Sequence, residues 1–128
     1  MKKIIFALLL LVSSVFADVE YVDIFDVYDK AADEHKVVMV MLSKEGCPGC
    51  QYMENVVFND KKIAKILKDK FVVAHVDIDK DGIPDGMDYF ATPTFYFLDA
   101  DENILKKLTG GENAKDFAST LQKVKAKK

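Results

Sequence analysis

Two cysteines, Cys47 and Cys50, are the residues of this sequence best suited to covalent chemistry. They are separated by Pro48 and Gly49, and they follow directly on an apolar, β-branched-rich run at residues 37–43. This order predicts a strand, then a tight turn, then a helix that begins near the sulfurs. The unpaired N–H groups and the dipole of a helix N-terminus stabilise a thiolate, so Cys47 is expected to be a nucleophile near neutral pH. A mixed disulfide formed at Cys47 can then be resolved by Cys50.

A structural disulfide and a metal site are the alternative interpretations of this cysteine pair. Secreted domains often carry structural disulfides, but a bridge across two residues closes too short a loop to constrain the unfolded chain much. A metal site would need more soft ligands than two thiolates and a nearby methionine supply. The spacing therefore favours a redox-active pair.

The first 17 residues have the pattern of a cleaved signal peptide. Lys2 and Lys3 form a short basic region, residues 4–12 are all apolar, and Val15 and Ala17 are small residues at the −3 and −1 positions of a cleavage site. An uncleaved membrane anchor is the alternative, but the apolar stretch is shorter than the roughly 18 residues that a spanning helix needs. We therefore expect export, with cleavage after Ala17.

The remaining residues, 18–128, are expected to form a single domain with one hydrophobic core. The formal net charge of the full chain is −3, and it becomes −5 when the two lysines of the leader are removed. The chain contains no arginine, which excludes bidentate guanidinium clamps. A mildly acidic domain of this kind is a poor nucleic-acid binder.

Apolar periodicity predicts the order helix, strand, helix, helix, strand, strand, strand, helix. Strands separated by helices, followed by a hairpin and a closing helix, indicate an α/β fold whose mixed central sheet is flanked by helices on both faces. The expected helices are residues 23–35, 50–57, from Asn59 or Asp60 to 70, and 113–124, and the expected strands are residues 37–43, 71–78, 94–98 and 104–108.

With these elements in place, the sequence resembles the thioredoxin-like superfamily over about residues 20–125. The resemblance is carried by the strand–Cys-x-x-Cys–helix unit and by the pair Thr92-Pro93, which opens the third strand. It implies a thioredoxin fold in which Pro93 is cis and faces the active-site sulfurs, an uncommon conformation otherwise. It also implies a substrate groove formed by Pro93, Thr92, Pro48 and Gly49, where the Thr92 backbone pairs with an extended segment. An ordinary strand-edge proline is the alternative.

More narrowly, the sequence is similar to small exported thioredoxin-fold proteins of bacteria. The segment at residues 53–60 and the strand end at residues 76–79 fit that group. The chain lacks room for the large helical insertion of the periplasmic disulfide oxidases, and it lacks the N-terminal dimerisation domain of the dimeric isomerases. The resemblance therefore implies a monomer and favours a reducing role.

Three positions depart from the thioredoxin pattern. Gly46 replaces the tryptophan before the first cysteine, Met41 replaces a buried acid, and the residues between the cysteines are Pro-Gly instead of Gly-Pro. Another group, or water, must then accept the proton of Cys50. His35 and His75 are expected to be structural, with a catalytic pairing to Cys47 as the alternative.

An aspartate-rich segment follows the second predicted strand. Its spacing matches positions 1, 3, 5, 9 and 12 of a calcium loop, with glycine at position 6. The alternative is an acidic turn, because Asp-Gly is turn chemistry, the twelfth residue is not glutamate, and a strand precedes the segment. We expect no bound cofactor, with calcium as the alternative. The candidate ligands are Asp77, Asp79, Asp81, Asp85 and Asp88.

Together these features predict an exported, periplasmic thiol–disulfide oxidoreductase that reduces protein disulfides and is regenerated by a membrane electron donor. Its partners are expected to be protein thiols and disulfides, not nucleic acid. A disulfide oxidase or isomerase is the alternative within the same chemistry, and a non-enzymatic metal-binding module is the alternative outside it. The residues between the cysteines tune the redox potential, and Pro-Gly does not by itself indicate a direction of electron flow. The reducing role is therefore inferred from the missing helical insertion alone.

Overall fold

Seven consecutive buried residues form β1 (Val37–Ser43), an inner strand of the sheet that lies between β2 and β3. A strand covered on both faces is expected to be apolar throughout, and this one is almost entirely so. It pairs in parallel with β2 (Phe71–Asp77) and antiparallel with β3 (Thr94–Leu98), and β3 pairs antiparallel with β4 (Ile104–Thr109). The order β2–β1–β3–β4 makes the mixed sheet that the sequence predicted.

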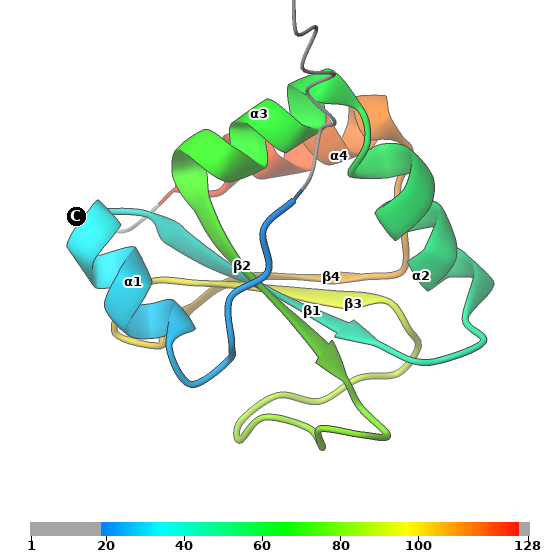
Figure 1. The fold of residues 1–128 in the computed structure, drawn as a ribbon, viewed down its shortest axis with the longest axis horizontal. Helices are drawn as coiled ribbons and strands as arrows, with labels where there is room; N and C mark the ends of the chain where they lie inside the picture. The colour runs from blue at the N-terminus through cyan, green and yellow to red at the C-terminus, as the bar shows by residue number, and fades with distance from the viewer. Residues whose placement is uncertain (1–18, 126–128) are drawn as a thin grey trace, which may run out of the picture.

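The computed structural model describes residues 19–125, and its helices cover both faces of the sheet (Figure 1). The predicted signal peptide lies outside the described residues. In the part that is described, no helix combines the length and the apolar character needed to cross a membrane. The helices are α1 (Val27–Glu34), α2 (Pro48–Tyr52), the π-helix η1 (Met53–Val57) that continues α2, α3 (Lys61–Lys70) and α4 (Ala114–Lys123).

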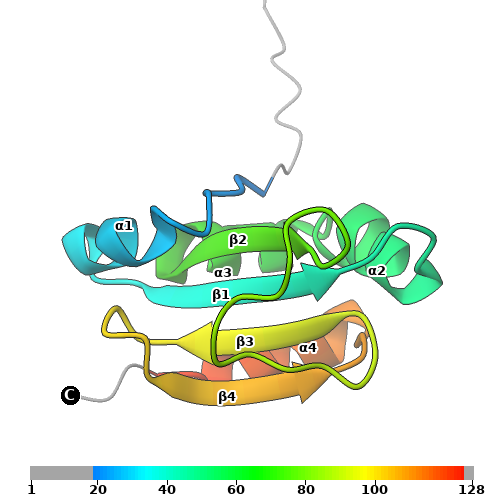
Figure 2. The same cartoon turned by 90° about the horizontal axis from the view of Figure 1, so that it is seen from below.

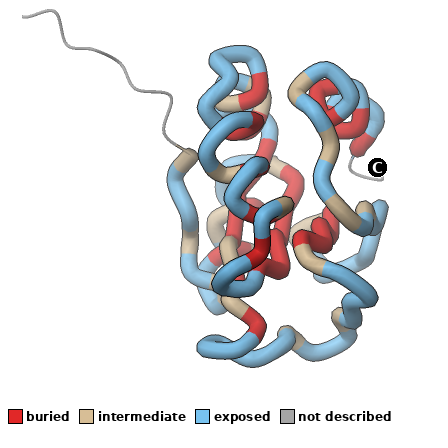
Figure 3. Tube along the Cα trace, turned by 90° about the vertical axis from the view of Figure 1, so that its right-hand side faces the viewer, coloured by how far each residue is buried: buried red, intermediate tan, exposed pale blue. Residues whose placement is uncertain are grey.

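Alternation along β1 divides the core into two clusters. The odd-numbered residues, such as Met39 and Met41, belong to the cluster that contains both cysteines and the inner faces of η1, α3 and α4. The even-numbered residues, such as Val40, belong to the cluster under α1. Figure 2 shows the four strands side by side with α3 and α4 behind them, and Figure 3 shows the buried positions running through the centre of the molecule.

The first helix is shorter than its apolar stripe predicted. It begins at Val27 rather than at Asp23, because the side chain of Asp23 accepts a hydrogen bond from the backbone N–H of Phe25 (2.9 Å) and holds residues 23–26 in a turn. Phe25, an apolar residue within the predicted helix, is 89% exposed. The two later helices begin where the sequence predicted and have side-chain caps: Asp60 accepts from two N–H groups of α3, and Asn113 accepts from one N–H group of α4.

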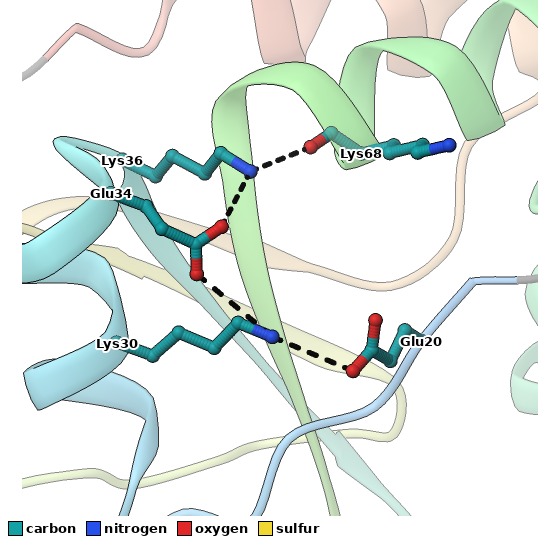
Figure 4. A network of polar contacts seen from close by, with 5 residues as sticks. All are labelled: Glu20, Lys30, Glu34, Lys36 and Lys68. Carbon is teal, nitrogen blue, oxygen red and sulfur yellow. Dashed lines mark hydrogen bonds and ion pairs between the residues drawn. The ribbon is translucent and has the colours of Figure 1, made fainter.

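A network of lysines and carboxylates joins the end of α1 to α3 and to the N-terminal segment (Figure 4). Lys36 Nζ lies 2.9 Å from a carboxylate oxygen of Glu34 and donates to the carbonyl of Lys68 (3.0 Å). Lys30 Nζ lies 3.5 Å from Glu20 and 3.9 Å from Glu34. The network borders a cavity of about 350 Å³ that neither cysteine lines.

Candidate active site

Cys47 and Cys50 form a disulfide at the N-terminus of α2. Cys47 is the N-cap residue, and its Sγ accepts a hydrogen bond from the backbone N–H of Cys50 at 3.1 Å. Cys47 is 9% exposed and Cys50 is 2% exposed. Cys47 is therefore the more accessible residue of the pair, and a backbone N–H at the positive end of a helix donates to its sulfur.

The turn between β1 and α2 is built from the residues that the local backbone requires. Gly46 has φ +75°, a conformation that glycine adopts without a steric cost. Pro48 stands at the start of the helix, where its missing N–H removes no hydrogen bond and its fixed φ suits the helix. Gly46 and Pro48 therefore place the two cysteines at the N-terminus of the helix, as predicted.

The Thr92–Pro93 peptide bond is cis, as the resemblance implied, and it lies against the disulfide. The hydroxyl of Thr92 donates to Cys47 Sγ at 3.3 Å, and the carbonyl oxygen of Thr92 lies 3.4 Å from the same sulfur. A Cβ added at Gly49 would lie 3.2 Å from Cδ of the Pro93 ring and 3.9 Å from the carbonyl oxygen of Thr92, so little room is left for a side chain at position 49. The four residues expected to form the groove are thus brought together around Cys47.

A third segment, the turn between β4 and α4, reaches the same place. The N–H of Gly110 donates to the carbonyl of Pro93 at 2.7 Å. A Cβ added at Gly111 would lie 3.3 Å from Sδ of Met53 and 3.8 Å from the carbonyl of Gly49. In the sequence, no local signal connects this glycine pair with the cysteines.

A protein-family model described as a thioredoxin-like domain matches residues 24–125. The chain belongs to this thioredoxin-like family. Among solved structures it is similar to a thioredoxin from Thermus thermophilus, with 28% identity, a TM-score of 0.69, and coverage of 83% of this chain and 86% of that one. No curated protein gives a significant match.

Two further solved structures share the fold of this thioredoxin-like chain. A putative disulphide-isomerase from Bacteroides thetaiotaomicron has 22% identity, a TM-score of 0.71, and coverage of 82% of this chain and 89% of that one. A structure titled DsbH oxidoreductase has 14% identity, a TM-score of 0.66, and coverage of 84% of each chain. At these identities the likeness establishes the fold and no more.

On the side of the sheet that packs against both cysteines of this thioredoxin-like domain, β2 carries the apolar Phe71 and Val73 and then the polar, partly buried His75. Met41 is fully buried in the cluster that contains both cysteines. Its partner in the β1–β2 register is His75, whose Nε2 lies 2.5 Å from Oε1 of Glu54 in η1. His75 was expected to be structural, and Glu54 was not singled out, because the contact joins two different elements, η1 and β2, across 21 residues. His35 ends α1 in a left-handed conformation, with φ 55°.

Tyr21 completes this polar group from the N-terminal segment. Its ring centroid lies 5.2 Å from that of His75, and its backbone forms an isolated parallel β-bridge with Val73 of β2. Burial, with a smaller contribution from the negative charge of Glu54, raises the pKa of Tyr21 to about 12. The phenol therefore stays protonated under ordinary conditions.

The aspartate-rich segment uses its carboxylates to hold its own backbone. Asp77 accepts from the N–H groups of Asp79 (2.9 Å) and Lys80 (3.1 Å), and Asp81 accepts from the N–H of Asp77 (3.0 Å). Within residues 19–125, no group of three or more His, Cys, Asp or Glu side chains is arranged to hold a metal ion. These hydrogen bonds are typical of an acidic turn, and calcium binding by the segment stays a prediction.

Proposed function

We propose that this thioredoxin-like protein is a thiol–disulfide oxidoreductase that reduces disulfides of other proteins. The observation that carries the proposal is the setting of Cys47. Its sulfur caps a helix, receives hydrogen bonds from the Cys50 N–H and the Thr92 hydroxyl, and lies beside the Thr92–Pro93 bond. Such donors favour the thiolate over the thiol, and the thiolate is the form that attacks disulfides.

The reaction proceeds through two exchanges. The Cys47 thiolate attacks one sulfur of a substrate disulfide, which forms a mixed disulfide and releases the other substrate sulfur as a thiolate. Cys50 loses its proton and attacks Cys47 Sγ, which forms the Cys47–Cys50 disulfide and releases the second substrate thiolate. The substrate gains two electrons, and a separate dithiol donor must return two electrons to the protein.

The substrate is proposed to bind as an extended segment across the end of α2. Gly49 and Pro93 lie close together beside Cys47 and form part of the proposed groove. The backbone of Thr92, just before β3, lies in the same groove, where a substrate segment can add by strand-like hydrogen bonds. The turn at Gly110 and Gly111 contacts Pro93 and approaches the carbonyl of Gly49, so it lies next to this groove.

The cellular setting is proposed from the leader. Residues 1–17 direct export and are removed, and the mature monomeric domain acts in the periplasm with a membrane protein as electron donor. N-terminal sequencing of the protein recovered from a bacterial periplasm tests this proposal. A mature chain that begins at Asp18 supports it, and a chain that retains Met1 contradicts it.

Alkylation and redox titration of the purified domain test the activity. We expect iodoacetamide to modify Cys47 of the reduced protein much faster than a free peptide thiol at neutral pH, and Cys47→Ser to abolish insulin reduction. A Cys47 no more reactive than a free thiol contradicts the proposal. A reduction potential near −120 mV contradicts the reducing direction and favours an oxidase, whereas a value near −270 mV supports it.

A further inference from the structure

The proposed reaction requires a proton to leave the interior of the molecule. Cys50 must become a thiolate before it can attack Cys47, yet Cys50 is 2% exposed and water reaches it poorly. On this face of the sheet, the odd-numbered residues of β1 are Val37, Met39, Met41 and Ser43, and none of these side chains is an acid or a base. The acceptor must therefore come from another element.

Glu54 and His75 bring an acid–base pair to this face of the sheet. Glu54 follows Cys50 by four residues, about one helical turn, along the continuous helix of α2 and η1. His75 is the register partner of Met41 on β2, and directly paired residues project to the same side of a sheet. The 2.5 Å contact between His75 Nε2 and Glu54 Oε1 fixes the carboxylate over this strand.

The surroundings of the pair suit proton transfer to solvent. The side chains of Glu54 and His75 are 30% and 25% exposed, so the pair connects the buried region with water. Tyr21 faces the pair from the N-terminal segment and remains protonated, as described above. Asp77, the next residue on the same side of β2, uses one carboxylate oxygen to accept two backbone N–H groups. The inward residues of α3, Ile63 and Leu67, are apolar.

We propose that Glu54, oriented by His75, is the base that accepts the proton of Cys50 during the resolving step. The proton passes from the Cys50 thiol to the Glu54 carboxylate, the Cys50 thiolate forms a bond to Cys47 Sγ, and the bond between Cys47 and the substrate breaks. The substrate leaves as a thiolate, and Glu54 then gives its proton to water. His75 is a positioning residue whose Nε2–H donates to the ionised carboxylate.

Reaction of the reduced protein with 5,5′-dithiobis(2-nitrobenzoate) separates the two exchanges. The first nitrothiobenzoate is released when Cys47 attacks the reagent, and the second is released when Cys50 resolves the mixed disulfide. In Glu54→Gln we expect the first phase to be unchanged and the second to slow roughly 100-fold at pH 7, the lower end of what a positioned base contributes. The rate of the second phase in Glu54→Gln should rise toward that of wild type as the pH rises, because hydroxide can then remove the proton of Cys50.

Matched variants separate this role from a general charge effect. Glu45→Gln removes an exposed carboxylate that precedes the cysteines and lies 3.9 Å from Lys80, and it should leave both phases unchanged. His75→Gln keeps an N–H donor for Glu54 and should behave nearly as wild type, whereas His75→Leu should slow the second phase only.

The inference rests on the proposed function, but the two fail differently. A wild-type protein whose first phase is no faster than that of a free thiol contradicts the function. Normal first phases with identical second-phase pH profiles in Glu54→Gln and wild type overturn the role of Glu54, as does equal slowing in Glu45→Gln. If Glu54→Gln does not fold by circular dichroism, a His75→Leu second phase that matches wild type overturns the proposal.

Discussion

The hydroxyl of Thr92 is the side-chain donor that touches Cys47, at 3.3 Å from Sγ. A hydrogen bond to an ionised acceptor stabilises the ionised form. In Thr92→Val, which keeps the shape and loses the donor, we expect the pH midpoint of Cys47 ionisation to rise by about one unit. Thiolate absorbance at 240 nm as a function of pH measures this midpoint.

Thr94→Val is the control for this prediction, because Thr94 lies two residues further on and donates to the carbonyl of Ala91 rather than to a sulfur. It should leave the ionisation of Cys47 where it is in wild type. An unchanged midpoint in Thr92→Val would contradict a role for the Thr92 hydroxyl and leave the N–H of Cys50 as the hydrogen-bond donor that stabilises the Cys47 thiolate.

At this scale the sequence predicts what is local and misses what is distant. Cys47, Pro48 and Cys50 reveal a capped helix start because three adjacent residues suffice to specify it. Glu54 and His75 meet only through a tertiary contact between η1 and β2, and their separation of 21 residues carries no periodic signal. The same holds for Gly110 and Pro93.

The element that carries Pro93 is a long segment after β2, and its anchor is the side chain of Tyr96. The Tyr96 hydroxyl accepts from the N–H of Asp88 (2.9 Å) and lies 2.6 Å from the Asp88 carbonyl and 2.7 Å from its Oδ1, to one of which it donates. Lys107 of β4 lies 2.5 Å from the same Oδ1. Two strands thus hold the segment that leads to the cis bond.

Removing the anchoring hydroxyl tests this account. In Tyr96→Phe we expect amide hydrogens of residues 79–92 to exchange about tenfold faster at pH 7, as for the loss of one hydrogen bond. Hydrogen exchange read by mass spectrometry measures the effect. Tyr89→Phe changes a more exposed tyrosine of the same segment and should exchange as wild type. Equal acceleration in both variants would contradict the anchor.

The same anchor should loosen in acid. The hydrogen bond from Lys107, followed by that from Tyr96, lowers the pKa of Asp88 below its ordinary value. A carboxyl whose pKa is depressed by folding contributes its stabilisation at pH values above the unfolded pKa, and the contribution is lost as the pH falls through the lower, folded value. Exchange in residues 79–92 of wild type, corrected for intrinsic rates, should therefore accelerate below about pH 4.

Element order is largely predictable, and element ends are less so. The continuous apolar run of β1 and the caps Asp60 and Asn113 fix their elements by local chemistry. The start of α1 was wrong because Asp23 captures the N–H of Phe25 in a turn, a competition that periodicity does not reveal. Within the aspartate-rich segment, Asp77 and Asp81 accept hydrogen bonds from backbone N–H groups of the same turn, and calcium binding there stays a prediction.

For the whole molecule, the direction of electron flow is tied to folding stability. The Cys47–Cys50 bond forms and breaks in both the folded and the unfolded chain, so the two redox equilibria and the two folding equilibria make a closed cycle. A protein whose fold favours the dithiol is a strong oxidant, as in the periplasmic oxidases, and a fold that favours the disulfide is a reductant. Stability in the two redox states therefore reports the direction.

For a reductant, urea should unfold the oxidised protein at a higher concentration than the reduced protein. Each 30 mV by which the folded pair is more reducing than the unfolded pair corresponds to about 1.4 kcal/mol of extra stability in the oxidised form. Unfolding curves with and without dithiothreitol measure the difference. The double variant Cys47→Ser, Cys50→Ser controls for the reagent, because its midpoint should not change. A reduced form that unfolds at a higher urea concentration than the oxidised form would reverse the proposed direction of electron flow. The donors around Cys47 would then stabilise the thiolate enough to make the domain an oxidant.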